Sequence, residues 1–138
     1  MKNAVLHVPI DRQSKKQLEQ LARRWGRTPS EAGAQLLEEG LRRSLFSQVE
    51  FRSTPAGRHA YITGTRLAIW QIADLLQQHG GSIEKTARYL QCPKEHVRTA
   101  ELYAQAYAGE IQGMIAENKA VTFESLSRVL PGLEKSCA

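Results

Sequence analysis

The sequence predicts a mainly α-helical protein made of two small modules with little β-structure. Its 138 residues, 41% of them hydrophobic and 24% charged, fit one folded domain or two very small ones. Apolar residues recur every three or four positions over most of the chain, which indicates helices. Strand-like patterns are confined to the N-terminus and to a hairpin pattern near residue 64. These observations predict an N-terminal strand with two helices, followed by a β-hairpin and three helices.

The first module, residues 1–46, is expected to begin with a short strand. Residues of one face alternate with those of the other: Ala4, Leu6, Val8 and Ile10 on one side, and Val5, His7 and Pro9 on the other. No second strand follows nearby in the sequence, and a single strand is not stable alone. We therefore expect a second copy of the chain to complete a two-stranded sheet.

Two helices are predicted after this strand. Asp11 is a good N-cap for a helix over residues 12–25, and Gly26 suits its C-terminal cap. Thr28 and Glu31 have the spacing of a capping box that starts the second helix. The buried side of this second helix is expected to hold Ala32, Leu36, Leu37, Leu41 and Leu45.

This order of strand, cap, helix, turn glycine and second helix resembles the ribbon-helix-helix repressor family. The resemblance implies a homodimer whose two-stranded ribbon lies in the major groove of operator DNA, while the start of the second helix holds a phosphate. The dimer interface is then expected to contain Leu6, Val8, Ile10, Leu37 and Leu41. The expected DNA contacts of this module are Lys2, Asn3, Val5, His7, Arg12, Arg27, Thr28 and Ser30.

Positive charge is concentrated in the same module. Residues 1–46 carry nine Lys and Arg against five Asp and Glu, whereas residues 47–117 carry seven of each. Phosphate contacts require such charge, so this module is the expected DNA-binding part. The opposing interpretation is that the ribbon only dimerises, because His7 alone among its outward side chains can hydrogen-bond a base.

The second module, residues 58–117, is expected to follow a linker over residues 47–57. The string Thr63 to Arg66 predicts a tight hairpin turn with Gly64 at positive φ. Three helices should come next. The first ends at the Gly80-Gly81 pair, the second is capped by Ser82, and the third runs without interruption from Pro93 to Glu117.

A helix-turn-helix signature lies within this module. Ala87, Cys92 and Val97 occupy the fifth, tenth and fifteenth places of a stretch that starts at Ile83. A recognition helix at this place would present Lys94, Arg98 and Thr99 to DNA. The alternative is a purely structural three-helix core, which the zero net charge of the module favours.

The string Gly64-Thr65-Arg66-Leu67-Ala68-Ile69, followed by Ile72, Leu75, Leu76 and Gly80, resembles a second family. This is the bacterial domain of unknown function four-three-three, and the resemblance covers residues 57–107. It implies a VapB-type antitoxin that neutralises a PIN-like ribonuclease toxin. We interpret Arg66 as a structural arginine that hydrogen-bonds loop carbonyls.

Residues 118–138 form a tail with one amphipathic turn. It is either a frayed end or a segment that binds a partner protein through Phe123, Leu126, Arg128 and Leu130.

Other classes of function have little support. The four histidines are scattered, and no catalytic triad, phosphate loop or metal motif is present, so no catalytic residue, cofactor or metal is expected. Cys92 and Cys137 indicate neither a disulfide framework nor a zinc site, which fits a reducing cytoplasm. No apolar run is long enough for a membrane span or a secretory signal.

The sequence therefore predicts a non-enzymatic antitoxin that represses its own operon as a DNA-bound homodimer. One alternative is a dimeric protein-interaction module that does not bind DNA, and another is a small enzyme.

Overall fold

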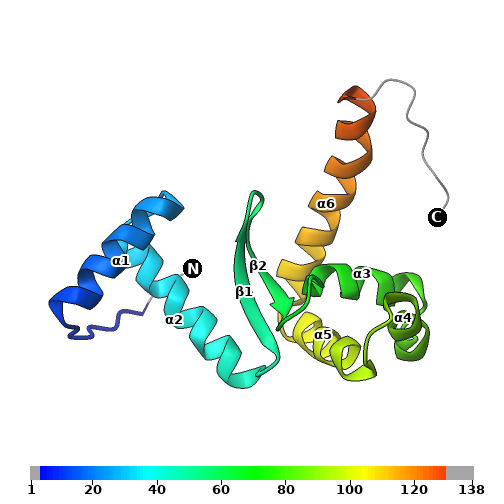
Figure 1. Cartoon of the computed structure of the whole chain (residues 1–138), viewed down its shortest axis with the longest axis horizontal. Coiled ribbons are helices and arrows are strands. Elements are labelled where there is room, and N and C mark those ends of the chain that lie inside the picture. Colours follow the sequence, from blue (N-terminus) through cyan, green and yellow to red (C-terminus); the bar gives the residue numbers. More distant parts are fainter. Residues whose placement is uncertain (1–3, 130–138) are drawn as a thin grey trace. The chain divides into compact units, whose positions relative to one another are not determined.

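The computed structural model describes the backbone of residues 4–129 and the side chains of residues 4–119. The chain separates into two compact units, Met1–Leu45 (unit 1) and Phe46–Ala138 (unit 2) (Figure 1). Over the described residues, six helices and one two-stranded antiparallel sheet make up the regular structure. The predicted mainly α class is therefore confirmed.

Unit 1 contains α1 (Arg12–Trp25) and α2 (Pro29–Leu45), which pack against each other. The predicted limits of α1 are confirmed. The Asp11 carboxylate accepts a hydrogen bond from the Ser14 N–H at 2.7 Å, and Gly26 ends the helix at φ 65°. These local interactions fix where α1 begins and ends.

The capping box of α2 is also confirmed. Thr28 Oγ1 accepts a hydrogen bond from the Glu31 N–H, and Glu31 Oε1 accepts one from the Thr28 N–H, each at 3.1 Å. Leu18 of α1 is the side chain nearest to Gly33 of α2, so the two helices approach closely there.

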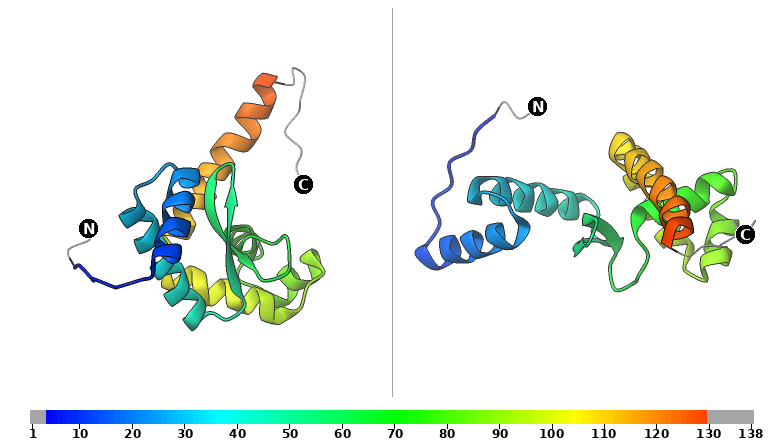
Figure 2. Two further views of the ribbon diagram at one scale, coloured as in Figure 1. Left: turned by 60° about the vertical axis from the view of Figure 1, so that its left-hand side comes forward. Right: turned by 90° about the horizontal axis from the view of Figure 1, so that it is seen from above.

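Residues 4–10 have no regular secondary structure in the single chain and are exposed throughout. Figure 2 shows them as an extended trace leading into α1. The strand predicted here is thus not formed within one chain, because no described residue offers it a neighbouring strand to pair with. The ribbon, which would need a second chain, stays a prediction.

Unit 2 begins with a hairpin of β1 (Val49–Thr54) and β2 (Gly57–Ile62), in which Val49 lies opposite Ile62 and Thr54 opposite Gly57. The linker predicted over residues 47–57 is therefore wrong. Val49 and Phe51 alternate with the charged residues Glu50 and Arg52, and this alternation belongs to a strand. Pro55-Ala56 form the turn that follows it.

The predicted turn over residues 63–66 is present, but it is not the tip of the main hairpin. Gly64 has φ 75° as expected, and the chain around it closes through one antiparallel bridge between Tyr61 and Ala68. A hydrogen bond from the Ile62 N–H to the Leu67 carbonyl, at 3.0 Å, supports the same closure.

Four helices complete unit 2: α3 (Ile69–Gln78), α4 (Ile83–Leu90), α5 (Lys94–Ala106) and α6 (Ala108–Val129). The single helix predicted from Pro93 to Glu117 is wrong, because Tyr107 interrupts it at φ −126° and ψ 47°. The Tyr107 ring packs against Tyr103 and Phe46, with centroids 4.7 and 6.2 Å away. Tertiary packing of aromatic rings accompanies a break that the periodicity does not indicate.

The core of unit 2 lies between one face of the hairpin and the helices. Buried members include Val49, Ile62, Ile69, Ile72, Val97, Ala100, Tyr103, Ile111 and Ile115. Of the helix-turn-helix signature, Ala87 and Val97 are buried and Cys92 packs against this core. The signature thus serves packing, whatever else the surface of these helices does. No helix among the described residues is long and apolar enough to cross a membrane.

The turn between α4 and α5 places a side chain where glycine is favoured. Gln91 has φ 55° and ψ 47°, the only positive φ at a non-glycine residue in the described part of the chain. The Cys92 N–H closes the turn by donating to the Ala87 carbonyl at 3.0 Å. A left-handed conformation costs an L-residue about 1 to 2 kcal/mol.

Replacing Gln91 by glycine is expected to raise the free energy of unfolding of unit 2 by about 1 kcal/mol. Denaturant unfolding of a Trp25→Phe chain, followed by Trp70 fluorescence, reports on unit 2 alone. The control Gln77→Gly, in the exposed end of α3, should lower stability by about 0.5 to 1 kcal/mol. A loss of stability in Gln91→Gly would contradict the assigned backbone conformation.

Candidate nucleic-acid interface

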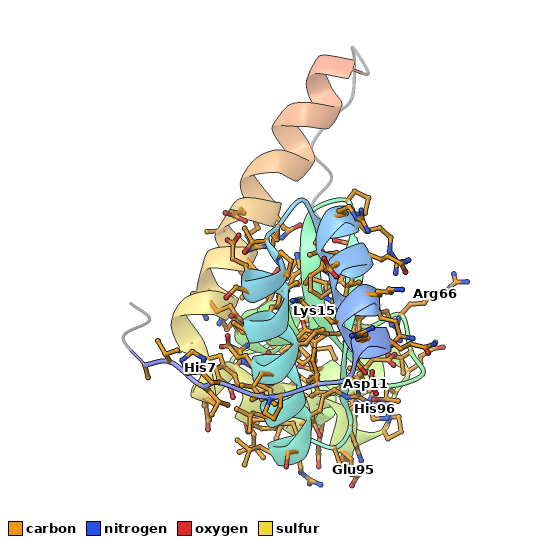
Figure 3. All side chains as sticks on the ribbon, turned by 90° about the vertical axis from the view of Figure 1, so that its left-hand side faces the viewer. His7, Asp11, Lys15, Arg66, Glu95 and His96 are labelled. Atoms are coloured by element: carbon orange, nitrogen blue, oxygen red, sulfur yellow. The ribbon has the colours of Figure 1, made fainter. Side chains whose placement is uncertain are left out.

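The segment before α1 exposes an unusual run of large apolar side chains. The exposed fractions are 83% for Val5, 68% for Leu6, 61% for Val8 and 52% for Ile10. Scattered exposed leucines are normal on protein surfaces, but a contiguous set marks an interaction site. His7 extends from the same segment (Figure 3).

A second apolar surface lies on α2. Leu37, Leu41 and Leu45 follow one another at steps of four residues and are all more than half exposed. Leu36 is exposed beside them, and Gly40 leaves open space within the same stripe. All five predicted dimer residues, Leu6, Val8, Ile10, Leu37 and Leu41, are therefore accessible to a partner in the single chain.

The predicted phosphate contacts of unit 1 gather around the starts of its two helices. Arg12 is exposed at the first position of α1. Arg27, Thr28 and Ser30 are exposed at the start of α2, where Arg27 lies 4.0 Å from Glu31 in a weak surface pair. Thr28 already caps its own helix through its hydroxyl group. Lys2 and Asn3 lie outside the described residues.

The predicted DNA contacts of unit 2 each have a partner within that unit. Lys94 Nζ lies 3.2 Å from Glu84 Oε1, and Arg98 lies 3.3 Å from Glu95. Thr99 Oγ1 lies 3.4 Å from Gln48 Oε1. Carboxylates therefore balance the cations at the start of α5, which makes this surface less suited to phosphate contacts than unit 1.

The structure does not support the interpretation of Arg66 as a structural arginine. Its side chain is exposed and points away from the turn (Figure 3), and it makes no hydrogen bond within the described structure. Thr65 holds the turn instead. Its Oγ1 donates to the Ile62 carbonyl at 2.8 Å and accepts the Leu67 N–H at 3.0 Å. Threonine hydroxyl groups commonly hydrogen-bond backbone groups of a turn, and this is the sequence signal that could have identified Thr65.

An open pocket of about 650 Å³ lies at the α4–α5 turn. Cys92 and Arg88 are among the residues that line it. Burial raises the pKa of the Cys92 thiol, so this group is neutral near pH 7 and a weak nucleophile.

The predicted partner-binding residues occupy the end of the described chain. Phe123, Leu126 and Arg128 belong to α6, which is continuous to Val129, so the expected separate turn is part of a long helix. Their side chains, and Leu130 altogether, lie outside the described residues.

Among residues 4–119, no three His, Cys, Asp or Glu side chains are grouped so that they could hold a metal ion. Comparison of the chain with protein-family models, with curated proteins and with solved structures found no match.

The N-cap of α1 generates a pH-dependent prediction. The Ser14 backbone N–H holds the pKa of the Asp11 carboxyl below its ordinary value. The cap is thus fully effective above the ordinary carboxyl pKa and is lost as the pH falls through the lowered one. An NMR titration should show this low pKa, together with loss of α1 helicity at acid pH. Asp11→Asn should retain the helix and remove that part of the acid transition, and an ordinary Asp11 pKa would contradict the cap.

Proposed function

We propose that the chain is a DNA-binding transcriptional repressor that acts as a homodimer, and that it serves as the antitoxin of a toxin–antitoxin pair. The main support for the repressor function comes from unit 1. An exposed segment with alternating apolar residues directly precedes two capped helices. This combination needs a second chain, and the family it resembles uses such a dimer to bind DNA.

Dimerisation follows from the exposed surfaces. If residues 4–10 of two chains pair as an antiparallel ribbon, their backbone groups hydrogen-bond each other and Leu6, Val8 and Ile10 share one face. The leucines of α2 supply further apolar surface. Removing apolar area from water contributes about 25 cal/mol per Å². Both surfaces are thus buried by one event, the meeting of two copies.

DNA binding follows from the side chains on the outer face of the proposed ribbon. Val5 and His7 would face the major groove, where a methyl contact to thymine and a hydrogen bond to a base are available to them. Arg12, Arg27 and the N-terminus of α2 lie where phosphates flank such a ribbon. The excess of cations in residues 1–46 supports this surface over the balanced one on α5.

The antitoxin part of the proposal concerns unit 2. It is supported by the resemblance of residues 57–107 and by the length of α6. Among residues 4–119, Ile115 is the last buried core residue, and α6 continues from there to Val129 and extends beyond the other elements of unit 2 (Figure 1). A helix that continues past its own core is available to a partner protein, here a PIN-like ribonuclease.

Leu6→Asp is expected to convert a dimer into a monomer at micromolar concentration, because it places a charge in the shared apolar face. Affinity for DNA from the region upstream of the chain's own gene should fall roughly a hundredfold, since two linked half-sites are lost. Sedimentation velocity and fluorescence anisotropy measure the two effects. The matched control is Leu102→Asp, since Leu102 is 56% exposed on α5 and should tolerate the change in both assays.

A dimeric Leu6→Asp chain would contradict the ribbon interface. A dimeric wild-type chain that does not bind this DNA even at low salt would leave the protein-interaction module as the function of unit 1.

Ending the chain at Lys119 is expected to weaken binding to a PIN-like ribonuclease encoded beside it by roughly thirtyfold, the effect of losing ~2 kcal/mol of hot-spot energy. Isothermal titration calorimetry measures the affinity, and Trp70 fluorescence in a Trp25→Phe background verifies that unit 2 stays folded. Leu102→Asp serves again as the control. Unchanged affinity of the shortened chain would exclude the end of α6 as the partner site.

A further inference from the structure

The outer surface of α1 carries a line of cations. Arg12, Lys16 and Arg23 are four and seven residues apart, so a period of 3.6 places them on one face of the helix. All three are exposed. The line covers 11 helical steps, about 16 Å at ~1.5 Å per residue. We call these three residues the α1 basic stripe.

The three cations of the stripe have no carboxylate partner in the described structure, whereas several other cations of the chain do. Arg42 lies 2.8 Å from Glu38, Lys94 lies 3.2 Å from Glu84, and Lys119 lies 3.0 Å from Asp74. No ion pair involves a cation of the stripe, even though Glu19 belongs to the same helix. No ion pair therefore competes with phosphates for these three cations.

The composition of the face indicates the kind of partner. The nearest neighbours of the stripe around the helix include the exposed amides Gln13 and Gln20. Leu18, Leu21, Ala22 and Trp25 lie on the other side of α1. Protein interfaces depend on apolar and aromatic anchors, which this face lacks. Phosphate oxygens are bound by Arg, Lys and Gln side chains, which make up this face apart from Glu19.

We propose that the α1 basic stripe binds phosphates of duplex DNA independently of sequence, outside the base pairs that the ribbon contacts. This inference rests on the proposed function and adds Lys16 and Arg23 to a DNA surface that otherwise reaches only Arg12 on this helix. Duplex DNA presents one charge per ~1.7 Å, so a helix face of this length meets several phosphates. The stripe thus contributes to the affinity for DNA and to its salt dependence, but not to sequence specificity.

A substitution of Glu19 tests the proposal through an expected gain, rather than a loss, of DNA affinity. Its position, three residues after Lys16 and four before Arg23, places a carboxylate in the middle of the stripe. A carboxylate there repels phosphates. Removing its charge should strengthen DNA binding, an outcome that a merely solvated surface would not produce.

The experiment uses the full-length chain and measures anisotropy with two duplexes over a range of salt. One duplex contains only the operator region that the chain protects in a footprinting assay, and the other contains the same region with flanking DNA on each side. For Lys16→Gln/Arg23→Gln on the longer duplex, the slope of log affinity against log salt should fall by about 0.9 per lost phosphate contact, close to 2 per chain. Glu19→Gln should raise affinity, and the preference for operator over scrambled DNA should be unchanged in both.

The control is Arg88→Gln, which removes an exposed cation of unit 2 and should leave the slope unchanged. An effect confined to the longer duplex assigns the phosphates to flanking DNA. An effect on both duplexes, with sedimentation of complexes that contain two duplexes, assigns them to a second DNA segment. Either supports the stripe.

Wild-type slopes and affinities in both the double variant and Glu19→Gln, with operator binding intact, would overturn the stripe and leave the proposed function standing. A loss of operator preference in the double variant would also overturn it, because the stripe would then contact bases. Absence of any DNA binding by the wild-type chain would overturn both.

Discussion

The apolar side chains of Val5, Leu6, Val8 and Ile10 are all more than half exposed within the described chain, and the proposed role of unit 1 depends on how that surface is covered. Water can satisfy the backbone groups of such a segment, but it cannot satisfy Leu6, Val8 and Ile10. Pairing with an identical segment solves both problems, because antiparallel strands satisfy each other's edges and place like faces together. The exposed leucines of α2 offer further apolar surface to the proposed second copy.

The pairing of charged side chains differs between the two units. In unit 1 the cations of α1 lack carboxylate partners, whereas in unit 2 the cations at the start of α5 are paired with Glu84 and Glu95. The proposed DNA-binding ribbon of the first unit and the proposed partner-binding helix of the second are consistent with this difference. The connection is short, since α2 ends at Leu45 and Phe46 already packs against Tyr103 with ring centroids 5.3 Å apart.

Features determined by local chemistry could be predicted from the sequence, and features determined by tertiary contacts could not. The Asp11 and Thr28 caps follow from side chains within three residues of the amides they bind. The strand β1 was missed because Pro55 and its neighbours resemble a linker, and only the register with β2 gives them a role. The break at Tyr107 accompanies aromatic packing that includes Phe46, 61 positions earlier in the chain. The residues of the candidate DNA surface stay a prediction, because the ribbon that would bring them together needs a second chain.

Isotope-filtered NMR on a mixture of labelled and unlabelled chains tests the second-chain requirement most directly. If the ribbon forms, nuclear Overhauser effects between chains should connect residues 4–10 of one copy with the same residues of the other, and their amides should exchange slowly. Contacts only within one chain, together with rapid amide exchange over this segment at millimolar concentration, would contradict the ribbon and the repressor built on it.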